Sequence, residues 1–290
     1  MRLIYLILLL LGMLNTAMAQ VEIKSYTKYI SSPSNSAISE DGNYYYVSHP
    51  QFAYIFPYLV FKLFQIKPTV LSIEIFHLVI NFFCAGFIYL IICLLSIQRP
   101  FKKIFIPGLI AFIVYLFSPA VLWFQANTYM SDTLVHLPFI LAVYTILKLL
   151  MRKRFYSVKY LLYYALFLFL MIYTSFLGIF FAATVFLYSL IKLRKETVFL
   201  PLIFITISVS ALTVLLIINQ YSQINGLEAY VIQMIDRFSE RGSFSGESFL
   251  GFLLRKIFEL KTLFINYATS YLPIFILLIS FGFLSLKKVP

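Results

Sequence analysis

Long apolar runs separated by short basic connectors dominate the chain from residue 69 onward. A transmembrane helix needs about 20 consecutive, mostly apolar residues, and the lengths of these runs fit that requirement. Together with a first helix and a helical hairpin described below, they predict an all-α polytopic membrane protein, a bundle of about eight transmembrane helices. The runs cover residues 69–97, 104–124, 133–150, 197–219 and 263–286.

The chain opens with a shorter apolar run. Residues 3–14 follow Arg2 and precede Ala17-Met18-Ala19, which is the layout of a cleavable signal peptide. The same residues could form an uncleaved, slightly short first transmembrane helix with its N-terminus in the cytoplasm. Both alternatives stay open for residues 1–20, and both export the residues that follow.

Residues 160–191 are apolar throughout and have a basic cluster at each end. As one helix this segment would be about 48 Å long, well beyond a hydrocarbon core of about 30 Å. A break at Tyr173-Thr174-Ser175 turns it into a short helical hairpin with both basic ends on one side. We therefore predict a broken hairpin whose arms stop short of the far interface, where protein or water must cover the irregular backbone.

Residues 52–66 are apolar but short, and Pro57 and Lys62 interrupt them. If this segment crossed the membrane, every later basic connector would change sides, although Lys and Arg favour cytoplasmic loops. We therefore expect an interfacial helix on the outer surface. The predicted organisation is a first outer loop with this helix at 21–68, a transmembrane core at 69–219, a second large outer loop at 220–262, and a last transmembrane helix with a basic cytoplasmic tail at 263–290.

The distribution of charge supports this topology. The cytoplasmic side then holds 14 of the 23 basic residues and one acid, Glu196, whereas the outer side holds the other nine basic residues and ten acids. A net charge of +12 would suggest nucleic acid as the partner of a soluble protein. Here the basic residues lie in connectors that fix orientation, so we expect a multi-pass protein of a bacterial inner membrane with the lipid bilayer, and no nucleic acid, as its partner.

Composition excludes several other classes of protein. Apolar residues make up 62% of the chain and charged residues 12%, against about 45–50% and 25% in ordinary globular proteins. A soluble fold of this size could not cover so much hydrocarbon. The sequence contains no Walker A loop, dinucleotide glycine fingerprint, zinc-ligand spacing or nucleophile elbow. A soluble enzyme, a disulfide scaffold and a disordered chain are thereby excluded.

The exported acids are the first candidates for chemistry. Glu40 and Asp41 lie in the first outer loop and Asp132 in the second. Carboxylates there could take a proton from a hydroxyl group or bind a divalent cation such as Mg²⁺ or Mn²⁺. For residues 40–43 the alternative is a plain turn. For Asp132 the alternative is an N-cap for the helix that follows.

Two further groups could contact phosphate. His49, followed by Pro50, could bind a metal or phosphate, or could be a hydrogen-bonded structural residue. Arg237 and Arg241 are four residues apart and would share one helix face. Their guanidinium groups suit a phosphate or pyrophosphate headgroup, and anionic lipid or a solvated helix face is the alternative.

The layout of residues 1–220 resembles a known family. The outer loop carries Asp41 at the start of DGNYYYVSHP, an amphipathic stretch ends in FKLF at 61–64, and YTSFLG at 173–178 marks the hairpin. With Ser118-Pro119 and Asp132, this pattern is similar to the glycosyltransferase-C superfamily, particularly the bacterial relatives of protein O-mannosyltransferases and lipid A aminoarabinose transferases. Such proteins often have His-Pro-Pro where this chain has His-Pro-Gln, and they usually cross the membrane more often. A short divergent or truncated member, a fragment and an inactive relative therefore stay open as alternatives.

The resemblance implies a function. Members transfer a hexosyl or pentosyl group from a polyprenyl-phosphate donor to an acceptor on the extracytoplasmic side. By this resemblance Asp41 would be the general base, and Asp132, with Glu40 or His49, would hold a divalent cation or orient the acceptor. Arg237 or Arg241 would neutralise the leaving phosphate, and the isoprenoid tail would lie in a groove with the hairpin as one wall. His49 and these two arginines are the expected phosphate contacts.

Two other functions remain as alternatives. A transporter or flippase would also be polytopic, but would need polar or charged groups at mid-membrane, where these spans carry almost no charge. A non-catalytic membrane assembly subunit would have the same spans without converging acids. The sequence identifies no protein partner, and convergence of Asp41, Asp132 and an arginine on one cavity would favour the transferase.

Overall fold

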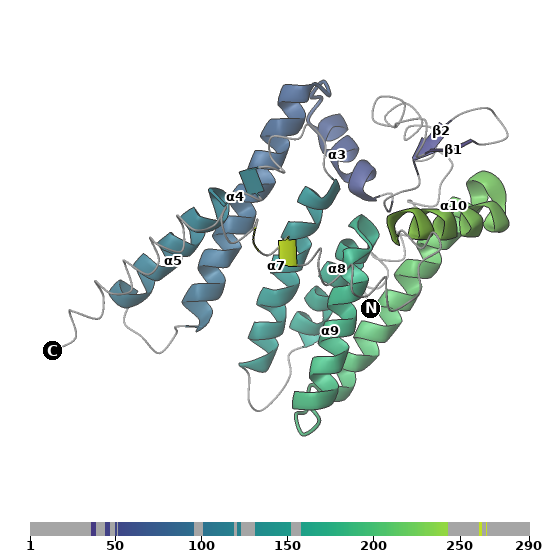
Figure 1. The fold of residues 1–290 in the computed structure, drawn as a ribbon. Helices are drawn as coiled ribbons and strands as arrows, with labels where there is room; N and C mark the ends of the chain where they lie inside the picture. The colour runs from purple at the N-terminus through teal and green to yellow at the C-terminus, as the bar shows by residue number, and fades with distance from the viewer. Residues whose placement is uncertain are drawn as a thin grey trace.

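The computed structural model describes residues 36–38, 44–46, 50, 52–95, 101–118, 121–122, 131–151, 158–242, 261–262 and 265. Helices make up nearly all of the regular structure in this part of the chain, in agreement with the predicted all-α class (Figure 1). A small antiparallel hairpin of β1 (Ser36–Ile38) and β2 (Tyr44–Tyr46) accompanies them. The hairpin falls inside the predicted first outer loop, where the sequence pattern did not indicate strands.

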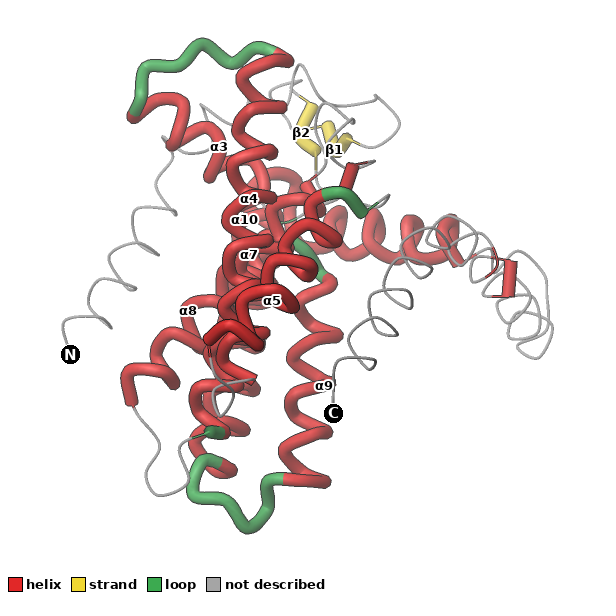
Figure 2. The backbone as a smooth tube through the Cα atoms, turned by 90° about the vertical axis from the view of Figure 1, so that its left-hand side faces the viewer, coloured by secondary structure: helices red, strands yellow, loops and turns green. Residues whose placement is uncertain are grey.

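The long helices stand side by side and alternate in direction along the chain (Figures 1 and 2). The most extensive packing joins α7 to α8 and α4 to α5, and α10 packs against both α8 and α9. A shorter helix, α3 (Phe52–Leu63), packs on α7 and α8 at one end. The long helices are α4 (Val70–Leu95), α5 (Phe101–Leu116), α7 (Ser131–Leu150), α8 (Val158–Thr174), α9 (Leu177–Lys192) and α10 (Phe199–Gly242).

Three segments are long and apolar enough to cross a membrane, namely Val70–Leu95, Thr133–Leu150 and Phe199–Gln223. They coincide with predicted runs 69–97, 133–150 and 197–219. Apolar helices of 10–17 residues cover Phe105–Leu116, Val158–Thr174 and Leu177–Lys192. The last predicted span, at 263–286, and the first, at 3–14, lie outside the described residues apart from Ile265.

Helix α5 is shorter than the predicted run at 104–124. It ends at Leu116, and the chain turns at Phe117 and Ser118. The cause is Pro119, since a proline disfavours helical geometry at the preceding residue. Ser118 then starts a new turn: the Leu122 amide donates to its carbonyl at 3.0 Å and the Val121 amide to its Oγ at 3.4 Å.

The apolar segment 160–191 is broken into α8 and α9, as predicted. The break lies at Ser175 and Phe176, where the Gly178 amide donates to the Ser175 carbonyl at 3.0 Å. A Cβ atom on Gly178 would lie 2.7 Å from the backbone nitrogen of Ile172, so this turn requires glycine for its close packing. Thr174 and Ser175 are buried, which meets the requirement that irregular backbone at membrane depth be covered.

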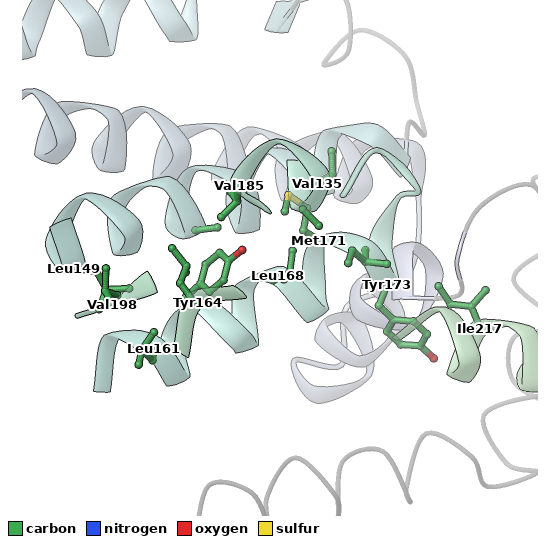
Figure 3. Packing of buried hydrophobic residues seen from close by; sticks show 14 of the residues in the cluster. Val135, Leu149, Leu161, Tyr164, Leu168, Met171, Tyr173, Val185, Val198 and Ile217 are labelled. Atoms are coloured by element: carbon green, nitrogen blue, oxygen red, sulfur yellow. The ribbon is translucent and has the colours of Figure 1, made fainter. Parts of the chain in front are cut away.

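The main hydrophobic core lies between α7, α8, α9 and α10 (Figure 3). Its centre is α8, whose Tyr164, Leu168 and Met171 are fully or almost fully buried. The Tyr164 hydroxyl lies 2.9 Å from Thr206 Oγ1, so the phenol has a polar partner inside the core. A second cluster packs α3 and α4 against α7, with Phe61, Phe76 and Cys84 among its members.

Helix α10 continues well past the predicted end of its span at residue 219. It runs to Gly242, so the first part of the predicted outer loop at 220–262 is helical. Gly226 has φ +81°, a backbone conformation that glycine adopts without steric cost. The helix bends there, and its last part lies across the direction of the bundle in both views (Figures 1 and 2).

Candidate functional site

The two ends of the bundle differ in charge. The ends of α4, α7 and α9 lie together with the starts of α5, α8 and α10 (Figure 1). Exposed Lys159, Arg194 and Lys195 are found here, and the Lys148 ammonium lies 5.5 Å from the centroid of the Tyr144 ring. We call this the basic end. Helix α3, the β hairpin, the start of α7 and the bent part of α10 lie at the opposite end.

The predicted site residues belong to segments of this opposite end. Asp132 is the second residue of α7, so it lies in the first turn, where a carboxylate is favoured by the helix dipole. Arg237 and Arg241 belong to the bent part of α10. The side chains of these three residues lie outside the described part of the chain. Glu40, Asp41 and His49 also lie outside it, Glu40 and Asp41 falling between β1 and β2 in the sequence.

A cavity of about 90 Å³ lies among α3, α4, α7 and α8. One of its wall residues, Leu134, lies two residues after Asp132 in α7. Its single polar wall residue, Thr174, donates its hydroxyl to the Leu170 carbonyl and so offers little to a polar ligand. The cavity can therefore hold an apolar group. The walls are formed by Phe52, Phe56, Ile80, Leu134, Leu137, Pro138, Leu141, Leu170 and Thr174.

A row of aromatic rings holds α3 over this cavity. Phe52 stacks on Phe56 at 5.4 Å between ring centroids and contacts Tyr173 of α8 at 5.7 Å. Phe56 and Phe61 each lie 5.7 Å from Phe76 of α4. Such ring pairs add to the stabilisation from burial. Helix α3, the predicted interfacial helix, is thereby packed against both α4 and α8. Its Phe52 and Phe56 form one wall of the cavity.

Tyr173 is also the link between the hairpin and α10. Its hydroxyl donates a hydrogen bond of 2.8 Å to Gln220 Oε1, and both residues are buried. Among the described residues the Gln220 amide nitrogen has no hydrogen-bond partner. From the sequence, Tyr173 was expected only as part of the break between two helices, and Gln220 was not predicted to take part in a site. The available signal was its place at the polar end of the apolar run 197–219.

Other buried polar groups lie on the spans that border the cavity. His77 and Asn81 are one turn apart on α4 and are both buried, as is Thr133 at the start of α7. His136, one turn further along α7, has its Nδ1 3.3 Å from the Tyr115 hydroxyl of α5. Ionisable groups inside a membrane span are rare and mark candidate functional positions. Outside the spans, burial raises the pKa of the Tyr230 phenol above its ordinary value.

The proposed metal ligands are not tested by this geometry. Among the described residues no group of three or more His, Cys, Asp or Glu side chains could hold a metal ion. The side chains of Glu40, Asp41 and Asp132 lie outside those residues. The divalent cation therefore stays a prediction from the sequence.

Comparison with known proteins adds no relative. No family model, no curated protein and no solved structure matches this chain.

Proposed function

We propose that this chain is a membrane glycosyltransferase that moves a hexosyl or pentosyl group from a polyprenyl-phosphate donor to an acceptor on the extracytoplasmic face. The observation that supports this proposal is the apolar cavity between α3 and the start of α7. Its wall includes Leu134, which lies two residues after Asp132 near the start of α7. A cavity of this size has room for roughly one isoprene unit, so it would take the part of the donor tail next to the phosphate.

The reaction would proceed by displacement at the anomeric carbon. Asp41 would accept the proton of the acceptor hydroxyl or amine, whose oxygen or nitrogen forms a bond to that carbon. The bond from the same carbon to the phosphate oxygen breaks, and its electron pair stays on the phosphate. Arg237 or Arg241 would stabilise the charge that develops there, and His49 would be a further phosphate contact.

Asp132 would orient the acceptor in this scheme. With Glu40 or His49, Asp132 and Asp41 could alternatively hold Mg²⁺ or Mn²⁺, which would supply positive charge near the phosphate. No step of the displacement described above depends on that ion.

The proposal includes a finer architecture. Three helices are long and apolar enough to span the membrane. We count as further crossings the two arms of the hairpin α8–α9, helix α5, and the segments at 3–14 and 263–286, which would give about eight crossings in all. The basic end would face the cytoplasm of a bacterial inner membrane, with a cytoplasmic N-terminus if residues 1–19 are retained.

The decisive experiment is a transfer assay with radiolabelled sugars. Membranes containing the full chain would be given a panel of polyprenyl-phosphate donors, and the wild type would be compared with Asp41→Asn and Asp132→Asn. We expect Asp41→Asn to lower transfer by about 10²-fold or more, the usual contribution of a general base. Glu196→Gln, an exposed acid at the basic end, is the matched control and should keep full activity. Undiminished transfer by Asp41→Asn would remove the centre of the proposal.

A transporter or flippase is the second candidate, because His77 and Asn81 are buried within the α4 span. It would move its substrate without breaking a bond. Substrate uptake into sealed vesicles that is lost in His77→Ala, with no sugar transfer by any preparation, would favour this candidate. Absence of both activities would favour an assembly subunit.

A further inference from the structure

The part of α10 beyond its bend forms a separate surface helix. The apolar span within α10 ends at Gln223, and Gly226, with φ +81°, follows three residues later. Residues 227–242, which we call the α10 arm, then extend across the bundle direction (Figures 1 and 2). The arm therefore begins where the span reaches the membrane boundary.

One side of the arm is held against the protein. Tyr230 is buried and stacks on Tyr221, with ring centroids 5.3 Å apart and an interplanar angle of 13°. Met234, one turn further on, packs on the same hydrophobic cluster. These contacts join the two sides of the bend, so the arm has a defined orientation relative to the span.

Another side of the arm exposes large apolar side chains. Leu227, Val231 and Ile235 are 55%, 44% and 61% exposed, and their spacing of four residues places them on one stripe of the helix. Ile232, beside this stripe, is 51% exposed. The exposed acid Glu228 lies beside this stripe, so the arm is amphipathic. An apolar stripe of this kind marks an interaction surface rather than a solvated face.

We infer that the α10 arm is embedded in the lipid leaflet at this end of the bundle, with the stripe of Leu227, Val231 and Ile235 among the acyl chains. Lipid is the occupant because the arm continues a membrane-spanning helix through a bend at the span's boundary. A helix that lies in the plane of the interface with a buried apolar face is the expected form of such a contact. The paired rings of Tyr221 and Tyr230 lie at the same boundary, where Tyr is enriched.

Helix α3, at the same end of the bundle, also exposes apolar side chains. Its C-terminal turn exposes Leu63 and Phe64 at the same end of the bundle, and the Lys62 ammonium lies 5.4 Å from the centroid of the Tyr58 ring. An amphipathic turn with apolar side chains and one lysine fits the headgroup region. The inference about the arm does not depend on the proposed reaction, because it uses only exposure, the bend and the span.

The inference can be tested with single tryptophans in the full chain, reconstituted in phosphatidylcholine vesicles. Trp123 is the single tryptophan of the sequence, so Trp123→Phe gives a clean background. Val231→Trp and Ile235→Trp probe the stripe. Asp236→Trp is the matched control, because helical register places it about half a turn of azimuth from Leu227, about 140° from Val231 and about 100° from Ile235. Leu212→Trp, at an exposed position within the span, is the deep reference.

We expect lipids that carry a spin label near the headgroup to quench the tryptophans at 231 and 235, with emission shifted to the blue. Lipids labelled near the chain end should quench the tryptophan at 212 instead, and aqueous acrylamide should quench mainly the one at 236. If acrylamide quenches the tryptophans at 231 and 235 as strongly as that at 236, the inference is wrong. Protection that grows with the ratio of protein to lipid, without quenching by lipid labels, would assign the stripe to a second copy and would also overturn it.

Discussion

At the scale of single residues, two buried phenols show how polar groups are accommodated in the apolar bundle. Tyr164 and Thr206 pair inside the core, and Thr206 Oγ1 also donates to the Leu202 carbonyl at 2.7 Å. Tyr173 donates to Gln220 Oε1, and the described residues offer that oxygen no second partner. The two hydrogen bonds therefore differ in what remains when the phenol hydroxyl is removed.

This difference leads to a prediction for stability. Tyr173→Phe leaves a buried amide oxygen without a donor, which costs about 1–3 kcal/mol, so the melting temperature in detergent should fall. Tyr164→Phe is the matched control, and it should have the smaller effect because Thr206 keeps its bond to the backbone. Equal melting temperatures for Tyr173→Phe and the wild type would show that the Tyr173–Gln220 bond contributes nothing.

At the scale of elements, the α8–α9 turn depends on a single missing side chain. The Cβ of an alanine at 178 would meet the Ile172 backbone nitrogen at 2.7 Å and its Cα at 2.8 Å. Backbone atoms in a packed turn cannot give way as the end of a flexible side chain can. The close approach of the two helices is therefore specific to glycine at this position.

We expect Gly178→Ala to destabilise the folded protein by about 1–3 kcal/mol, the usual cost of overpacking. Gly86→Ala is the control, since a Cβ at Gly86 has no atom within 4 Å and alanine is the better helix former. Thermal unfolding in detergent, followed by circular dichroism, would compare the two variants. A Gly178→Ala protein as stable as Gly86→Ala would contradict the assigned packing of the turn.

Much of the element pattern could be read from the sequence, because apolar runs of sufficient length have few alternatives in a membrane. The hairpin break followed from the length of the run 160–191. The continuation of α10 past residue 219 and its bend at Gly226 did not, because the polar residues after 219 were predicted to form a loop. Likewise Pro119 was visible, yet its effect in ending α5 at Leu116 was not anticipated.

The candidate site was less predictable, because it depends on contacts between residues that are far apart in the sequence. Asp132 could be chosen because it precedes an apolar run. Gln220 could have been noticed at the polar end of the run 197–219, but its pairing with Tyr173 could not be predicted, since it joins residues far apart in the chain. The cavity likewise depends on how α3 lies over α7 and α8, which is set by ring contacts such as Phe52 with Tyr173. Tertiary packing of this kind leaves no local pattern in a single sequence.

At the scale of the whole molecule, the proposed function depends on the apolar cavity as the seat of the donor tail. Leu137→Trp would fill this space without changing charge. We expect the KM for a polyprenyl donor to rise about tenfold, which corresponds to about 1.4 kcal/mol of lost binding, whereas kcat at saturating donor should be unchanged. Leu215→Trp on the exposed face of α10 is the control. An unchanged KM for Leu137→Trp would separate the cavity from the donor site.

Sidedness is a second property of the whole molecule. Lys195→Cys would place a thiol in the exposed connector at the basic end, and Gln65→Cys would place one just after α3. With Cys93 replaced by alanine, an impermeant maleimide added to intact cells should label the cysteine at 65 and leave the one at 195 unlabelled until the membrane is opened. The reverse labelling pattern would show that the topology is opposite to the proposed one, and it would contradict a transfer reaction on the extracytoplasmic face.

The short hairpin has a consequence for the surrounding lipid. Helices α8 and α9 contain 17 and 16 residues, about 25 Å each by helical rise, against a hydrocarbon layer of about 30 Å. The outward side of α9 exposes Phe180, Leu187 and Ile191, so in the proposed topology acyl chains would lie against a helix that is shorter than the hydrocarbon layer. Hydrophobic mismatch of this size is relieved by local thinning of the bilayer. We therefore expect the bilayer to be thinner beside α9 than elsewhere around the protein.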